Sequence, residues 1–157
     1  MLELSIALPI KVQNGGLFIS RGVGRHPSRK LTSWEIIFVE KGTLTIQEDD
    51  RVFEVKAGES LLLWPGRRHV GTEDFPGDLR FYWLHFDIER VNESLPQAFP
   101  LEIEQYCVVR DPQYVTALFR QFLIEQEKLQ RSVALEIIVL LILQQVSLSR
   151  SYEDKSD

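Results

Sequence analysis

The chain has 157 residues, 44% of them hydrophobic and 26% charged, which excludes a disordered or fibrous protein and is typical of one globular domain. Its formal net charge of -5 predicts that these residues carry no basic surface for nucleic acid. The single cysteine, Cys107, cannot form an intramolecular disulfide, so we expect a reducing, cytoplasmic environment. The longest apolar run, 137–143, is shorter than the roughly 20 residues that span a bilayer, so we expect no membrane helix.

Short apolar segments rich in β-branched and aromatic residues occupy the chain up to residue 109. They are separated by turn residues and recur closely, with no helical pattern between them. This arrangement predicts an antiparallel sandwich or barrel. The expected strands cover residues 17–20, 34–40, 43–47, 52–55, 61–64, 80–88 and 106–109.

Two of these strands carry side chains that could enclose a small molecule. Residues 58–69 form a glycine turn, an apolar strand and a Pro-Gly corner that ends in His69. Alternation along the strand 80–88 predicts one face of mixed aromatic and polar side chains and one uniformly apolar face. The mixed face carries Phe81, Trp83, His85 and Asp87. We expect it to line a ligand cavity; the alternative is that its aromatic rings only fill the barrel.

A helical period begins after residue 109. Asp111 is a suitable N-cap, and Pro112 suits the first helical position because the N–H that proline lacks would have no partner there. The apolar residues that follow fall on one stripe, which we expect to pack against the barrel. They are Val115, Leu118, Phe119, Phe122 and Leu123.

A second helix is expected to begin at a Ser132 cap and to end near residue 149. Its apolar run, 137–143, surrounds the helix axis, and one interface cannot bury every side. Either the helix is enclosed within its own domain or it also buries a face against a second copy of the chain, and the small domain favours the homodimer. The residues expected at the dimer interface are Ile138, Leu141, Ile142 and Gln145.

Four segments, in this order and spacing, resemble the N-terminal cupin domain of AraC-type transcriptional regulators. They are residues 34–42, 57–59, 64–69 and 81–86, and they are followed by the two helices. With the helices included, the resemblance covers nearly the whole chain. It implies a mostly β fold, in which a cupin-like antiparallel β-barrel (jelly roll) precedes two α-helices.

The resemblance also implies how the chain is divided. Residues 1–109 would form the effector-binding barrel, residues 110–150 a helical pair for dimerisation, and residues 151–157 a linker or chain end. A C-terminal helix-turn-helix domain, which these residues do not include, would be the only part to contact DNA. A naturally short relative without that domain is the alternative.

The resemblance raises the question of a metal ion. Metal-dependent cupins carry a pair of histidines shortly before a glutamate, and a further histidine at the Pro-Gly corner. Here Glu35 and His69 match, but the expected pair falls either at Arg29 and Leu31 or at Ser28 and Lys30, and neither placement offers a ligand. The spacing of His26 matches no such pattern. Two of four ligands remain, whereas a stable site usually needs at least three protein groups. We therefore expect no metal and no other cofactor.

Little else in the sequence points to catalysis. Cys107 lies in an apolar segment with no histidine close in sequence, so it is better interpreted as a small core residue than as a nucleophile. We predict a binding protein and not an enzyme. The alternative is a small cupin enzyme, of isomerase or dioxygenase type, that uses Glu35 and His69.

The expected ligand is a small polar metabolite, such as a sugar or sugar derivative. An aromatic ring covers its C–H surface, polar side chains bind its hydroxyl groups, and arginine binds a carboxylate or phosphate. The last of these contacts is implied by the resemblance, because in this family an arginine from the region before the strand 34–40 can reach the effector. The residues expected to bind the ligand are Trp83, His85, Phe81, Glu35, His69, Arg25 and Arg29.

Overall fold

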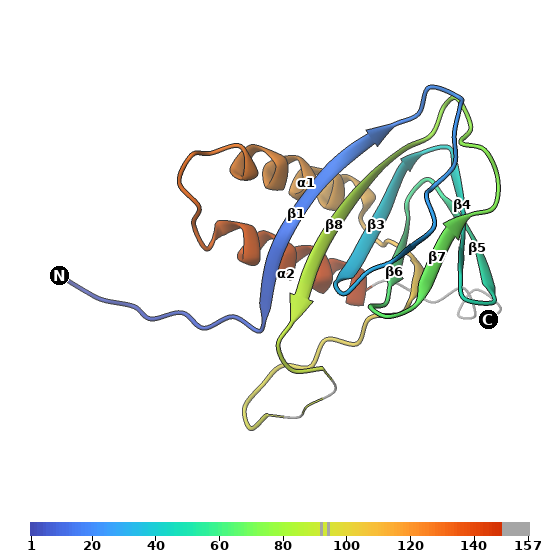
Figure 1. Ribbon diagram of the computed structural model, residues 1–157. Helices are drawn as coiled ribbons and strands as arrows, with labels where there is room; N and C mark the ends of the chain where they lie inside the picture. Colours follow the sequence, from blue (N-terminus) through green and yellow to red (C-terminus); the bar gives the residue numbers. More distant parts are fainter. Residues whose placement is uncertain (92, 94, 149–157) are drawn as a thin grey trace.

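The computed structural model describes residues 1–91, 93 and 95–148 (Figure 1). Strands occupy the first two thirds of the chain and helices follow them. In chain order the elements are β1 (Ile10–Ile19), β2 (Arg29–Lys30), β3 (Trp34–Lys41), β4 (Thr43–Glu48), β5 (Arg51–Lys56), β6 (Glu59–Leu63), β7 (Arg68–Gly71), β8 (Arg80–Ile88), β9 (Tyr106–Val108), α1 (Pro112–Gln126) and α2 (Ala134–Ser147).

The strands form two antiparallel sheets. The larger has the order β1-β8-β3-β6-β9 and the smaller the order β2-β7-β4-β5. Helices α1 and α2 pack against each other and against β1, and Figure 1 shows them together behind the larger sheet. The predicted fold, antiparallel β structure followed by two helices, is confirmed.

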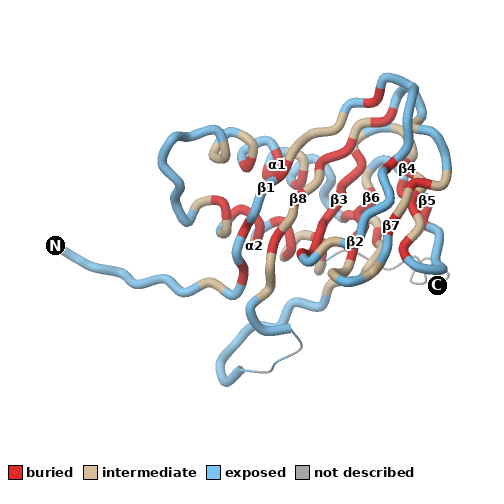
Figure 2. The backbone as a smooth tube through the Cα atoms, viewed as in Figure 1, coloured by how far each residue is buried: buried red, intermediate tan, exposed pale blue. Residues whose placement is uncertain are grey.

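A hydrophobic core lies on each side of the larger sheet because side chains alternate along its strands. On β3, Ile37 and Val39 belong to the core between the sheets, whereas Ile36 and Phe38 belong to the core under the helices. On β8, Tyr82, Leu84 and Phe86 contact the helix side, and Phe81 and Trp83 the inter-sheet side. The predicted division of this strand into two faces is therefore confirmed. Figure 2 shows buried positions running along the strands of both sheets.

All the predicted strands are present; β8 has the predicted bounds, the others have shifted ends, and two short strands were not predicted. Strand β1 begins seven residues before the predicted start at residue 17, because it pairs with β8 from Ile10 onward. Strands β2 and β7 carry charged residues and little apolar alternation, so no local pattern marks them. Their extended form depends on pairing with each other and, for β7, with β4.

The predicted start of α1 is confirmed. The Asp111 carboxylate accepts a hydrogen bond from the backbone N–H of Tyr114, and Pro112 is the first helical residue. Helix α2 begins one residue after the predicted start, and the Ser132 hydroxyl accepts from the N–H of Ala134. Its predicted end near residue 149 and the predicted linker 151–157 lie outside the described residues. Within the described chain, neither helix is long and apolar enough to cross a membrane.

The buried side of α2 revises the predicted dimer interface. Ile138 and Ile142 are 8% and 0% exposed and pack in the core between the helices and the larger sheet. Both side chains are covered by their own domain and offer no surface to a second copy of the chain. Leu141 is 38% exposed and Gln145 is partly exposed, so only these two of the predicted residues remain accessible.

Candidate functional site

A cavity of about 320 Å³ opens between the two sheets, beside the segment that joins β1 to β3. Aromatic side chains and charged or polar ones share its wall. Its lining consists of Phe18, Arg25, His26, Pro27, Arg29, Glu35, Phe75, Phe81, Trp83 and His85. All the predicted ligand-binding residues except His69 are in this lining, and His69 lies beside Glu35.

Glu35 is the buried acid of the site. It has the same orientation on β3 as Ile37 and is 4% exposed. It lies directly across from His85 in the antiparallel pairing of β3 with β8, and Glu35 Oε1 is 3.7 Å from His85 Nε2. Burial raises the pKa of Glu35 to about 7, and the positive charge of Arg29 opposes this shift. The carboxyl group therefore titrates near neutral pH.

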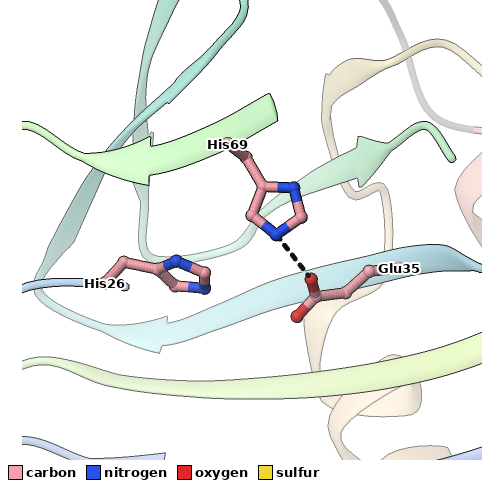
Figure 3. A group of neighbouring side chains, drawn as sticks. All are labelled: His26, Glu35 and His69. Carbon is pink, nitrogen blue, oxygen red and sulfur yellow. Dashed lines mark ion pairs between the residues drawn. The ribbon is translucent and has the colours of Figure 1, made fainter. Parts of the chain in front are cut away.

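His69 extends from β7 toward Glu35. Its Nε2 is 3.8 Å from Glu35 Oε2, as the dashed line in Figure 3 marks, which is too long for a hydrogen bond. The side chain is 1% exposed, and neither ring nitrogen has a hydrogen-bond partner within the described part of the chain. Burial, and then the charge of nearby His26, lower the pKa of His69 to about 4. A neutral imidazole with two free nitrogens thus faces the glutamate.

His26 completes the cluster, although its position in the sequence gave no reason to place it there. Its ring centroid lies 5.4 Å from that of His69, and Figure 3 shows both rings near the Glu35 carboxylate. One ligand atom from each of the three residues lies within 4.8 Å of the others. The sequence-based count of two candidate metal-ligating side chains is therefore corrected to three candidates.

A close backbone contact positions His26. The N–H of Gly71 donates to the His26 carbonyl oxygen at 2.9 Å, and a Cβ on Gly71 would lie 2.6 Å from the His26 nitrogen. Only glycine allows the segment before β2 to approach β7 this closely. The only hint of the cluster in the sequence was the small number of histidines. The chain has three, and all of them lie around Glu35.

His85 and Trp83 form a continuous part of the cavity wall. Their ring centroids are 5.3 Å apart, and His85 Nδ1 is 3.3 Å from the Ser33 hydroxyl. Burial lowers the pKa of His85, and the charge of Arg29 lowers it further. A second hollow of about 270 Å³ lies on their other side. It is lined by Gln13, Asn14, Arg29, Leu31, Thr32, Ser33, Trp83 and His85.

The two arginines of the lining have different surroundings. Arg25 forms an ion pair with Asp74 at 2.7 Å, and both side chains are more than half exposed. Arg29 pairs through its backbone with His69, and its charge acts on the pKa values of Glu35 and all three histidines. Arg29 is therefore a cation whose charge acts on every titratable side chain around Glu35.

Residues 20–143 match the AraC-like ligand binding domain, which is well over half of the chain. This chain belongs to that family. Members of the AraC-like family bind a ligand in this domain, and all the residues that line the cavity except Phe18 lie within the matched range. The resemblance seen in the sequence is thus confirmed.

One curated relative is the uncharacterized HTH-type transcriptional regulator YisR of Bacillus subtilis (strain 168). The AraC-like domain described here is 39% identical to it over 80 residues, which cover 47% of this chain and 28% of that protein. The match therefore spans less than a third of the relative's length.

Solved structures are similar to part of this chain. The plu4264 protein of Photorhabdus luminescens is 21% identical with a TM-score of 0.40, and the match covers 49% of this chain and 62% of that one. A variant of the oxalate decarboxylase OxdC of Bacillus subtilis is 10% identical with a TM-score of 0.42, over 55% of this chain and 23% of that one.

Proposed function

We propose that this AraC-like domain binds a small polar metabolite, a sugar or sugar derivative, in the cavity between its sheets. It would serve as the sensing and dimerising part of a cytoplasmic transcription regulator whose helix-turn-helix domain lies outside the 157 residues. The observation that carries the proposal is the wall on which Trp83 adjoins His85 and Glu35. Family membership favours binding over catalysis.

The chemistry of the wall supports a carbohydrate-like ligand. An indole face covers the C–H surface of a sugar ring, and a partly exposed imidazole and a carboxyl group bind hydroxyl groups. Arg29 adds a cation, which favours an acidic substituent such as a carboxylate or phosphate. The cavity volume of about 320 Å³ is within the range of small-molecule sites.

The second hollow indicates where a longer ligand would extend. It shares Arg29, Trp83 and His85 with the first, and its far side carries the amides of Gln13 and Asn14. Amide groups both donate and accept hydrogen bonds, as hydroxyl-rich ligands require. A ligand with one ring against Trp83 and a polar extension past His85 would contact both hollows.

A hydrogen-bonded connection from the cavity to the helices supports a sensing role. The Gln126 side chain at the end of α1 accepts from the Gly15 N–H at 2.8 Å and donates to the Gly15 carbonyl at 2.9 Å. Further along β1, Arg131 donates to the Val12 carbonyl at 2.6 Å. Gly15 and its neighbour Gly16 lie across from the ligand-facing strand β8. A ligand that moves this part of β1 would therefore displace the helices.

A stripe of exposed apolar side chains on α2 and on the residues that cap its two ends supports dimerisation. It consists of Val133, Ile137, Leu141 and Leu148, which are 38–43% exposed. Their spacing places them along one side of the helix, opposite the buried side. A self-complementary contact through this stripe would bury them in a homodimer. This stripe replaces the interface predicted from the sequence and retains Leu141.

A thermal-shift screen tests the ligand assignment. Sugars, sugar acids, sugar phosphates and amino acids are added to the protein in the presence of a chelator, and Tm is recorded. A ligand at 100 times its Kd should raise Tm by about 5–10 °C. Trp83→Ala should abolish this shift. Trp64→Ala is the matched control, because Trp64 packs on Trp34 and Arg67 outside the cavity.

Two results would count against the proposal. If no metabolite class changes Tm either with the chelator or without it, the sensing role is contradicted, and a purely structural dimerisation role gains support. If Trp64→Ala abolishes a shift as completely as Trp83→Ala does, the ligand binds elsewhere.

A further inference from the structure

We propose that His26, Glu35 and His69 form a site for a divalent transition metal ion, such as zinc, manganese or iron, in the wall of the cavity. One ligand atom from each lies within 4.8 Å of the others, and all three residues are buried. The site depends on His26, which comes from the segment before β2 and has no place in a spacing motif. The inference deepens the proposed function because the ion would lie where the ligand binds.

The donor set suits such an ion. Two imidazoles and a carboxylate are a common protein ligand set for divalent iron, zinc and manganese, and they leave further positions open to a small molecule. At metal–ligand bonds of about 2.0–2.2 Å, neighbouring ligand atoms lie about 3–3.5 Å apart. The observed separations, of which Glu35 Oε2 to His69 Nε2 is 3.8 Å, require side-chain movements of about 1 Å or less to close around an ion.

A hydrogen bond to the backbone orients the His26 ring so that its other nitrogen can bind an ion. His26 Nδ1 lies 3.0 Å from the carbonyl oxygen of Pro27, and a carbonyl can only accept, so Nδ1 carries the hydrogen. The lone pair of the neutral ring is therefore on Nε2. Metal-bound histidines commonly use one nitrogen for the ion and donate the other N–H to a carbonyl, as His26 does here.

The unpartnered ring of His69 is the strongest independent evidence for the metal site. Buried polar side chains nearly always have hydrogen-bond partners, and those that do not require an explanation. Both ring nitrogens of His69 are buried and unpartnered within the described chain. An ion bound to Nε2 would satisfy one of them at the point where His69 faces Glu35.

The surrounding charges indicate what else the ion would bind. A dication with one carboxylate keeps a net positive charge, and Arg29 adds another. A ligand that binds both the ion and Arg29 would therefore carry an anionic oxygen group. Among sugar derivatives, this favours a sugar acid or another hydroxycarboxylate over a neutral sugar.

Metal content provides the direct test. The protein is purified without a metal-affinity tag, incubated with zinc, manganese or cobalt(II), dialysed and assayed by mass spectrometry. We expect one ion per chain, and a rise in Tm of about 5–10 °C at 100 times the Kd of the ion, reversed by chelator. Cobalt should give visible absorption bands of a nitrogen- and oxygen-ligated site. Less than 0.1 ion per chain in a folded sample, with no change in Tm, would overturn the proposal.

Variants test the ligand set. His26→Gln, Glu35→Gln and His69→Gln should each lose the cobalt bands and the metal-dependent rise in Tm. Glu59→Gln is the matched control, because Glu59 is a buried glutamate bonded to the Lys56 N–H and the Tyr106 hydroxyl outside the cavity. Circular dichroism establishes folding, and a variant that does not fold is replaced by the corresponding alanine. Retention of the ion in His26→Gln, together with its loss in His85→Gln, would also overturn the assignment.

The test of metal binding and the test of ligand binding can give different outcomes. The ligand screen above is run with chelator, so it measures binding that does not depend on an ion. A metabolite that binds only when the ion is present supports both proposals, whereas one that binds equally well with and without the ion leaves ligand sensing intact and shows that the ion takes no part in it.

Discussion

The indole ring of Trp83 occupies the space that a side chain at position 16 would fill. A Cβ on Gly16 would lie 2.7 Å from Trp83 Cζ2 and 2.8 Å from Cε2. Gly16 and Trp83 are also direct neighbours in the pairing of β1 with β8. The ring that we assign to ligand binding therefore rests on the backbone of β1, one residue from the point where Gln126 attaches α1 to Gly15.

Gly16→Ala should displace the Trp83 ring and weaken ligand binding. The added methyl group overlaps a large ring, and such overpacking typically costs about 1–3 kcal/mol of stability. The emission of Trp83 should change with it, measured in a Trp34→Phe, Trp64→Phe background. Gly77→Ala is the control, because a Cβ on Gly77 meets nothing within 4 Å. Unchanged emission and unchanged ligand affinity in Gly16→Ala would show that the ring does not depend on this contact.

Gln126→Ala should loosen α1 from β1. It removes both hydrogen bonds to Gly15 and leaves two backbone groups without that partner, at a cost of about 1–3 kcal/mol in the free energy of unfolding. Urea denaturation measures this loss. Gln121→Ala, on an exposed part of the same helix, should change stability by less than about 0.5 kcal/mol. Equal effects of the two substitutions would contradict the assigned role of Gln126.

Leu141→Glu should convert a homodimer into monomers. A charge in the middle of an apolar interface is left without a partner when the interface forms. Sedimentation velocity at several concentrations reports the oligomeric state. Ile124→Glu is the control, since Ile124 is 58% exposed on α1, away from the proposed stripe. A wild-type chain that stays monomeric at high concentration would refute the dimer itself.

His69→Leu should abolish metal binding without lowering the stability of the metal-free protein. In the presence of chelator, leucine replaces a buried imidazole that has no hydrogen-bond partner among the described residues, so we expect equal or greater stability, by up to about 2 kcal/mol. The same variant should show no metal-dependent rise in Tm. Chemical denaturation with and without zinc measures both effects. A large loss of stability in chelator would mean that His69 has a structural role.

The strand and helix pattern was largely readable from the sequence because it depends on local periodicity. Alternation along β8 predicted that Phe81, Trp83 and His85 face the cavity, although Asp87, predicted on the same face, is not in its lining. The Asp111-Pro112 pair predicted the start of α1. Strands β2 and β7 were missed because their extended form comes from pairing and not from an apolar pattern. Ile138 and Ile142, predicted at a dimer interface, are buried within their own domain, because a fully apolar helix does not indicate which of its sides that domain covers.

The sequence by itself determined the order of the elements and the inward face of β8, since both are encoded in residues close together along the chain. It also determined membership of the AraC-like family, through the order and spacing of several segments. Only the tertiary structure decided that His26 joins Glu35 and His69, that Trp83 rests on Gly16, and that Gln126 holds Gly15 from 111 residues away. These contacts depend on how the connecting segments cross the sheets, and that path is set by pairing and packing between distant residues. Spacing along the chain therefore undercounted the candidate metal ligands at this site.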